Sequence, residues 1–125
     1  MWRQYNPNPT GNKAGDCAVR AICKATGKPW EEVYIEICMR GLMYGDWGSN
    51  NSVWGSYLRD LGYVREPVPC DRDCTVESFA EEHPKGTYIL ALSGHTVTIE
   101  NGDWFDSWDS GQCVPIFYWI KKKED

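Results

Sequence analysis

The spacing of apolar residues changes near residue 86, and this change determines the expected fold class. Before it, apolar side chains recur at the three-to-four-residue spacing of helices; after it, β-branched and aromatic residues form short runs. Helices are predicted over 17–26, from Pro29 to Gly41, from Ser52 to Gly62 and over 76–82, and strands over 87–92, 95–100, 103–108 and 114–120. We therefore expect one α+β domain over residues 1–125, with N-terminal helices packed on a C-terminal antiparallel β-sheet.

The charge balance limits the partners of such a domain. Thirteen Lys and Arg residues stand against 18 Asp and Glu residues, for a formal net charge of −5, which disfavours a nucleic-acid partner. The chain has no apolar run of about eighteen residues, and residues 1–10 are polar and interrupted by prolines, so neither a membrane span nor a signal peptide is expected. These features predict a cytoplasmic protein, and they give no indication of its oligomeric state.

Six cysteines without a secretion signal suggest free thiols in a reducing compartment. Cys17 differs from the rest because it is expected in the first turn of a helix, directly after Gly15-Asp16, where Asp16 is expected to cap that helix. The positive potential at a helix N-terminus lowers the pKa of a thiol and stabilises the thiolate, which is the attacking species. Cys17 is therefore a candidate nucleophile. The alternative is a small buried helix residue, the role expected of Cys23 and Cys38.

The dipeptide Asn101-Gly102 predicts a two-residue hairpin turn that sets the register of its two strands. That register places His95 opposite Trp108 and Val97 opposite Asp106. His95 and Asp106 are then diagonal neighbours on one face, where the carboxylate can accept a ring N–H and orient the imidazole. Trp108 can shield this hydrogen bond from water.

A nucleophile at a helix start, a histidine on a strand and an orienting carboxylate are the three roles of covalent acyl transfer. The segments Gly15-Asp16-Cys17, Gly94-His95-Thr96-Val97 and Asp106-Ser107-Trp108 resemble, in this chain order, the motifs of the papain-like cysteine peptidase superfamily. The resemblance implies a papain-like fold, Cys17 as nucleophile, His95 as base and then acid, and Asp106 as orienter. It further implies a peptide or protein substrate, with no cofactor and no metal.

Two compact branches of that superfamily fit the length of the chain. One resembles bacterial double-glycine leader peptidases and the other resembles peptidoglycan amidases and endopeptidases. Asp106-Ser107-Trp108 favours the first. In both cases the substrate bond is an amide or isopeptide bond, cleaved through a thioester on Cys17.

The chain departs from the family pattern at the residue that helps to bind the oxyanion. The family has a Gln shortly before the cysteine, whereas here the nearest amide is Asn12, to which we assign that role. A turn-forming role for Asn12 is an equally good interpretation. Asp16 is expected to raise the thiol pKa of Cys17, and Arg20 can neutralise it, although an ordinary surface ion pair between Asp16 and Arg20 explains both residues.

A Gly-rich loop over 41–51 carries large aromatic side chains that are not easily buried. Tyr44, Asp46 and Trp47 in this loop, together with Trp108, are the candidate substrate-binding residues. Two alternative interpretations of the chain remain open. One is a catalytically idle protein-binding module, and the other is a zinc-stabilised domain that uses Cys70, Cys74, His83 and Cys113.

Overall fold

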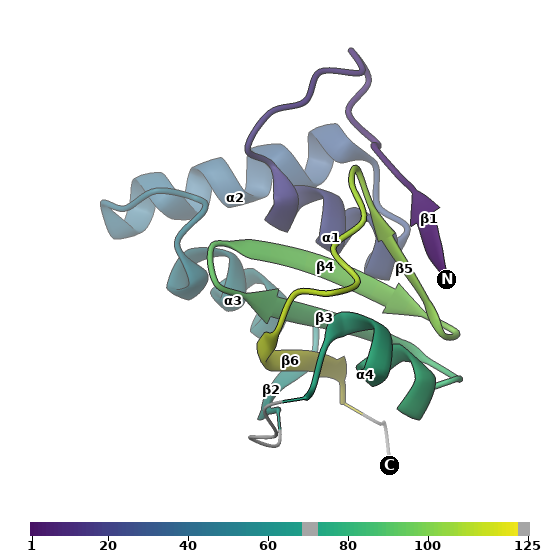
Figure 1. The fold of residues 1–125 in the computed structure, drawn as a ribbon. Helices are drawn as coiled ribbons and strands as arrows, with labels where there is room; N and C mark the ends of the chain where they lie inside the picture. Colours follow the sequence, from purple (N-terminus) through teal and green to yellow (C-terminus); the bar gives the residue numbers. More distant parts are fainter. Residues whose placement is uncertain (69–72, 123–125) are drawn as a thin grey trace.

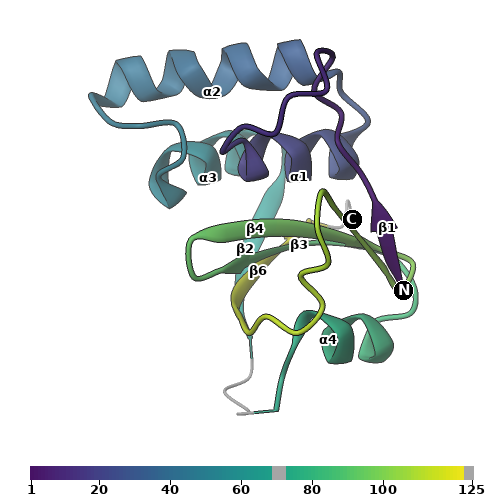
Figure 2. The ribbon, with the colours of Figure 1, turned by 45° about the horizontal axis from the view of Figure 1, so that its top comes forward.

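The computed structural model describes residues 1–68 and 73–122, which form a six-stranded sheet covered by helices on both faces (Figures 1 and 2). The helices are α1 (Cys17–Thr26), α2 (Trp30–Tyr44), α3 (Asn51–Asp60) and α4 (Val76–Glu82). The strands are β1 (Trp2–Gln4), β2 (Tyr63–Pro67), β3 (Thr87–Leu92), β4 (His95–Glu100), β5 (Asp103–Asp106) and β6 (Pro115–Lys121), in the sheet order β1-β5-β4-β3-β6-β2. The predicted α+β class is confirmed.

The sheet is mixed and not purely antiparallel, which corrects the sequence prediction. β1 pairs in parallel with β5, with Trp2 opposite Trp104 and Gln4 opposite Asp106, while the other pairs are antiparallel. Neither β1 nor β2 was predicted, and both are edge strands. Edge strands are short and largely exposed, so they carry little of the alternating apolar pattern that identifies a strand.

Two hydrophobic clusters lie on opposite faces of the sheet. On one face α1, α2 and α3 pack on Ile89, Ala91 and Trp119, and on the other α4 packs on a set that includes Leu90 and Ile99. Figure 2 shows this division, with α1 directly above β4 and α4 below the sheet. Inside the first interface the Thr98 hydroxyl donates to the Ala21 carbonyl over 2.6 Å, which ties α1 to β4.

The predicted hairpin between β4 and β5 is present with the predicted register. Glu100 pairs with Asp103, and Asn101 and Gly102 have φ values of 51° and 84°, which are the positive values that a two-residue turn needs. β5 ends at Asp106, two residues earlier than predicted. The Asp106 carbonyl accepts bonds from the Tyr5 N–H (2.9 Å) and Trp2 Nε1 (3.1 Å), so β1 fixes the end of β5.

Helix α2 extends past Gly41, where the sequence predicted its end, to Tyr44. Gly41 is needed inside the helix because a Cβ there would lie 2.7 Å from the Asp46 carbonyl oxygen. Gly45 ends the helix with φ 66° instead. Tyr44 is therefore a helix residue and not a loop residue.

Among the described residues, no helix has both the length and the apolar character needed to cross a membrane.

Candidate active site

Cys17 is the first residue of α1, and its thiol is half-buried. Asp16 occupies the N-cap position, yet its side chain makes no capping hydrogen bond to the helix. It accepts instead from Arg20, in a short ion pair, and from Trp30 Nε1 over 2.9 Å. The predicted capping role of Asp16 is thus corrected, and no side-chain cap competes for the N–H groups of the first turn of α1.

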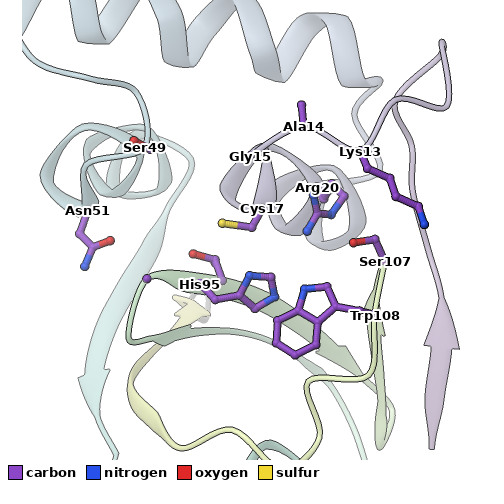
Figure 3. Close-up of a pocket in the computed structure, with 12 residues that line it drawn as sticks. Lys13, Ala14, Gly15, Cys17, Arg20, Ser49, Asn51, His95, Ser107 and Trp108 are labelled. Carbon is purple, nitrogen blue, oxygen red and sulfur yellow. The ribbon is translucent and has the colours of Figure 1, made fainter.

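His95 lies at the start of β4 and faces the Cys17 sulfur (Figure 3). Burial alone would raise the pKa of the Cys17 thiol, but the hydrogen bond and the positive charge of His95 outweigh burial and lower it. A backbone hydrogen bond at Thr96 and the charge of Arg20 act in the same direction. The site therefore favours the thiolate, the nucleophilic form of cysteine.

The other side of the His95 ring bonds to Asp106. His95 Nε2 lies 2.6 Å from Asp106 Oδ2, so Nδ1 is the ring nitrogen that remains for the thiol. Burial alone would lower the pKa of His95, but its bonds to Asp106 and Cys17 raise it to about 9. The lowered pKa of the Cys17 thiol and the raised pKa of His95 together favour a thiolate beside an imidazolium.

Asp106 is only 1% exposed, and its hydrogen bonds hold it in the ionised form. Besides His95, it accepts from the Ser110 hydroxyl (2.7 Å) and the Ser107 N–H (2.8 Å). Burial alone would raise the pKa of the Asp106 carboxyl, but these bonds, led by that from His95, lower it. A carboxylate held in this way fixes the orientation of the imidazole.

Arg20 links the two carboxylates of the site, Asp16 and Asp106. Its guanidinium pairs with Asp16 and, through Nη2, with Asp106 Oδ1 at 3.3 Å. The Arg20 side chain is 8% exposed and that of Asp16 is 5% exposed, so the predicted alternative of a surface ion pair is wrong. Because Asp16 is paired with Arg20 and Trp30, its charge does not oppose the Cys17 thiolate as the sequence suggested.

Cys17 and His95 line an open cavity of about 550 Å³, called here the catalytic cavity. Figure 3 shows Trp108 beside His95 and Asn51 on the far side of Cys17. The Trp108 and His95 ring centroids are 4.8 Å apart. The structure thus brings together four predicted site residues: Cys17, His95, Asp106 and Trp108.

Asn12 is exposed and does not line the catalytic cavity. Its N–H donates to the Thr10 hydroxyl and its carbonyl accepts from the Asn6 amide, both over 3.3 Å. These local bonds are those expected of a turn-forming residue, which is the alternative interpretation of Asn12. Asn12 lines the neighbouring cavity between α1 and α2.

The three substrate-binding candidates at the end of α2 and in the loop after it do not lie at one site. Trp47 is 81% exposed and lines the same neighbouring cavity, which also contains Cys17. Asp46 lines neither cavity that contains Cys17; it accepts from the Trp47 N–H (2.8 Å) and from Asn50 Nδ2 (3.0 Å), so it shapes the loop. Tyr44 also lines neither of these cavities.

Sequence reasoning missed several residues of the catalytic cavity, of which Asn51 is the clearest. Asn51 begins α3, and its Oδ1 accepts from Trp54 Nε1 over 3.2 Å, which leaves the amide N–H groups as donors. The polar run Ser49-Asn50-Asn51-Ser52 marked a helix start, but no spacing rule connected it with Cys17. Lys13, Ser49 and Ser107 also line this cavity and were not predicted as site residues, although Ser107 lies within the Asp106-Ser107-Trp108 motif.

Of the four candidate zinc ligands, Cys70 lies outside the described residues. Within residues 1–68 and 73–122 no group of three or more His, Cys, Asp or Glu side chains is placed to hold a metal ion. Cys17, Cys23, Cys38 and Cys113 are free thiols.

Comparison of the chain with protein-family models, with curated proteins and with solved structures gives no match.

Proposed function

We propose that this protein is a papain-like cysteine hydrolase that cleaves an amide or isopeptide bond through a thioester on Cys17. One observation carries the proposal: the His95 ring faces the Cys17 sulfur on one side (Figure 3) and bonds to the buried Asp106 carboxylate on the other. The order of the three residues in the chain, on a helix start, a strand start and the next strand end, supports the papain-like assignment. The proposed substrate is a peptide or protein, and the proposed compartment is the cytoplasm.

The proposed reaction begins with attack by the Cys17 thiolate on the substrate carbonyl carbon, which forms a C–S bond. The carbonyl oxygen becomes an oxyanion, and the Cys17 N–H at the start of α1 is the donor closest to the nucleophile. His95 then gives its proton to the substrate nitrogen, the C–N bond breaks, and the amine leaves. What remains is an acyl group bonded to Cys17 as a thioester.

Water completes the cycle. His95, now neutral, takes a proton from water as the water oxygen attacks the thioester carbonyl. The C–S bond breaks, the acid product leaves, and the Cys17 thiolate and the His95 imidazolium are restored. Asp106 keeps the imidazole in place throughout, and it stays ionised because His95 and Ser110 bond to it.

A second candidate, the idle protein-binding module, is favoured by one feature of α2. The helix presents apolar side chains to solvent, namely Ile35, Met39, Leu42 and Met43, with exposures from 55% to 84%. Contiguous exposed apolar side chains are common where proteins dock on one another. In such a module Cys17 would have no catalytic role.

The two candidates are separated by a panel of thiol-directed electrophiles with peptide-like recognition groups, applied to the wild type and to Cys17→Ser. The hydrolase reacts through Cys17 faster than through the exposed thiol of Cys38, and Cys17→Ser removes that labelling. Equal labelling of Cys17 and Cys38 across the panel would favour the binding module.

A further inference from the structure

A second cavity opens from Cys17 on the side away from His95. It has a volume of about 560 Å³ and lies between α1, α2 and the loop that follows α2. It shares Ala14, Gly15, Cys17 and Ser49 with the catalytic cavity, but His95 is not part of it. We call it the α1–α2 cavity. The nucleophile therefore lies where two cavities of different character meet.

Apolar and aromatic side chains line the α1–α2 cavity. Trp30 and Tyr34 stack with their ring centroids 4.6 Å apart, and Ile37 beside them is almost completely buried. Trp30 is fixed by its bond to Asp16, whose charge is already neutralised by Arg20. Asp16 is part of the lining, but because its carboxylate is paired with Arg20 and Trp30, it presents no unpaired charge to the cavity.

Trp47 borders the cavity from the loop, and the backbone beneath it is closely packed. A Cβ at Gly48 would lie 2.6 Å from Ile37 Cγ2, so only glycine allows the loop to approach α2 so closely. Asp46 bonds to the Trp47 N–H, and the Asn50 N–H bonds to the Trp47 carbonyl over 3.0 Å. The loop thus fixes the backbone that carries a large, mostly exposed aromatic side chain at the edge of the cavity, and exposed loop residues on a fixed backbone often serve in binding.

The proposed chemistry assigns a direction to each group on the attacked carbonyl carbon. The leaving nitrogen has to reach His95, which protonates it, so the leaving group occupies the catalytic cavity. The oxyanion points to the N–H groups at the start of α1. The remaining substituent, the acyl half of the substrate, points away from His95, and the α1–α2 cavity opens from Cys17 on that side.

We infer that the α1–α2 cavity is the specificity pocket of this hydrolase and that it takes a large apolar side chain on the acyl half of the substrate. This inference rests on the proposed function. It assigns apolar recognition to the walls made by Trp30, Tyr34 and Trp47, and it makes the catalytic cavity the site of the leaving group. An acyl group too small to reach these walls gains nothing from them.

The test compares p-nitrophenyl acetate with p-nitrophenyl hydrocinnamate, which have the same leaving group and differ only in the acyl half. Each ester acylates the Cys17 sulfur as its C–O bond breaks and p-nitrophenolate leaves. Each rate is corrected for the Cys17→Ser background and divided by the rate with N-acetylcysteine at the same pH. The ratio of the two corrected rates is the acyl selectivity, which we expect to exceed about tenfold in the wild type.

Two variants remove the apolar walls, and one matched variant leaves them intact. Tyr34→Ala and Trp47→Ala are each expected to lose most of the acyl selectivity, and both side chains are exposed enough for the fold to tolerate the change, at 44% and 81%. Tyr44→Ala changes a tyrosine of the same helix, 57% exposed, that lines neither cavity with Cys17, and it should keep the selectivity within about twofold.

The outcomes separate this inference from the proposed function. Acylation that depends on Cys17 but shows a selectivity near one, or a selectivity that survives both Tyr34→Ala and Trp47→Ala, would overturn the pocket and leave the hydrolase standing. No Cys17-dependent acylation with either ester would overturn the hydrolase itself.

Discussion

Cys17 and Cys23 lie on the same short helix, α1, in environments that act on a thiol in opposite directions. At the start of the helix the Cys17 thiol contacts His95, and its pKa is lowered despite partial burial. Further along the helix Cys23 is buried in the core, and burial together with the negative charges of Asp16 and Glu31 raises its pKa to about 12. The surroundings of Cys17 therefore favour its thiolate, whereas those of Cys23 keep it a neutral thiol.

The comparison shows that the surroundings of each thiol decide its pKa: burial dominates at Cys23, whereas the hydrogen bond and charge of His95 outweigh burial at Cys17. The charges act in opposite directions at the two thiols: His95 and Arg20 lower the pKa of Cys17, whereas Asp16 and Glu31 add to the effect of burial at Cys23. A thiol becomes a nucleophile when its anion is stabilised and accessible, and a packing residue when it is neither. The following predictions test this difference, from the largest expected effect to the smallest.

Cys17→Ser is expected to reduce to background the turnover of a peptide substrate built on the recognition group that the electrophile panel prefers. The hydroxyl of serine stays protonated where the thiol is ionised, so no nucleophile remains. Cys23→Ala is the matched control on the same helix. It should keep the activity and lose about 1 kcal/mol of unfolding free energy through the small void it leaves in the core. Initial rates and thermal unfolding of both variants measure the difference, and activity in Cys17→Ser would refute the nucleophile assignment.

His95→Gln is expected to lower turnover by about a thousandfold, because both the cation that stabilises the thiolate and the acid that protonates the leaving nitrogen are lost. His83→Gln is the control, since His83 lies at the end of α4 with Nδ1 bonded to the Phe79 carbonyl (2.8 Å) and its ring stacked on Phe79. His83→Gln should keep turnover close to that of the wild type, so steady-state kinetics should show a difference of nearly a thousandfold between the two variants. Similar losses in both would mean that His95 has only a structural role.

Asp106→Asn is expected to lower turnover by about a hundredfold or more, because an amide no longer holds His95 in its ionised, oriented form. It should also change the pH profile. His95 keeps its proton up to about pH 9 in the wild type, so activity falls as the pH rises through that value. Without the Asp106 charge the pKa of His95 drops, and the fall should begin at lower pH. An unchanged upper limb of the kcat/KM profile would contradict this account of the His95 charge.

Trp108→Ala is expected to have the smallest effect, a few-fold loss of kcat/KM. The indole packs beside His95 and is itself 46% exposed, so its removal lets water reach the His95–Asp106 bond without removing a group that reacts. Single-turnover rates at saturating substrate separate this effect from weaker binding. A loss as large as that of Asp106→Asn would show that Trp108 does more than shield the bond.

The features that could be predicted from the sequence depend on local rules. The span of α1, the span of α4 and the register of the β4–β5 hairpin follow from Gly27, Thr75 and Asn101-Gly102, which act on their own neighbours. The hairpin register alone brought His95 and Asp106 together, and the structure places them in contact.

What could not be predicted depends on partners distant in the chain. Asp16 was expected to cap α1, but Trp30 and Arg20 take its oxygens, and Arg20 in turn is shared with Asp106. β1 has a strand partner only because β5 offers its open edge, so its three residues carry no pattern of their own. Asn51 enters the catalytic cavity because the loop after α2 folds back on Gly41, an approach that no residue spacing encodes.

The central claim is that His95 makes Cys17 a thiolate, and site-resolved alkylation across pH tests it most directly. Iodoacetamide labelling of each cysteine, followed by mass spectrometry from acidic to alkaline pH, gives a separate curve for Cys17, for the exposed Cys38 and for the buried Cys23. We predict that Cys17 reacts with a midpoint well below that of a free thiol, that His95→Gln moves this midpoint upward, and that Cys23 stays unlabelled in the folded protein. A Cys17 midpoint at or above about 8.5, unchanged in His95→Gln, would contradict the account.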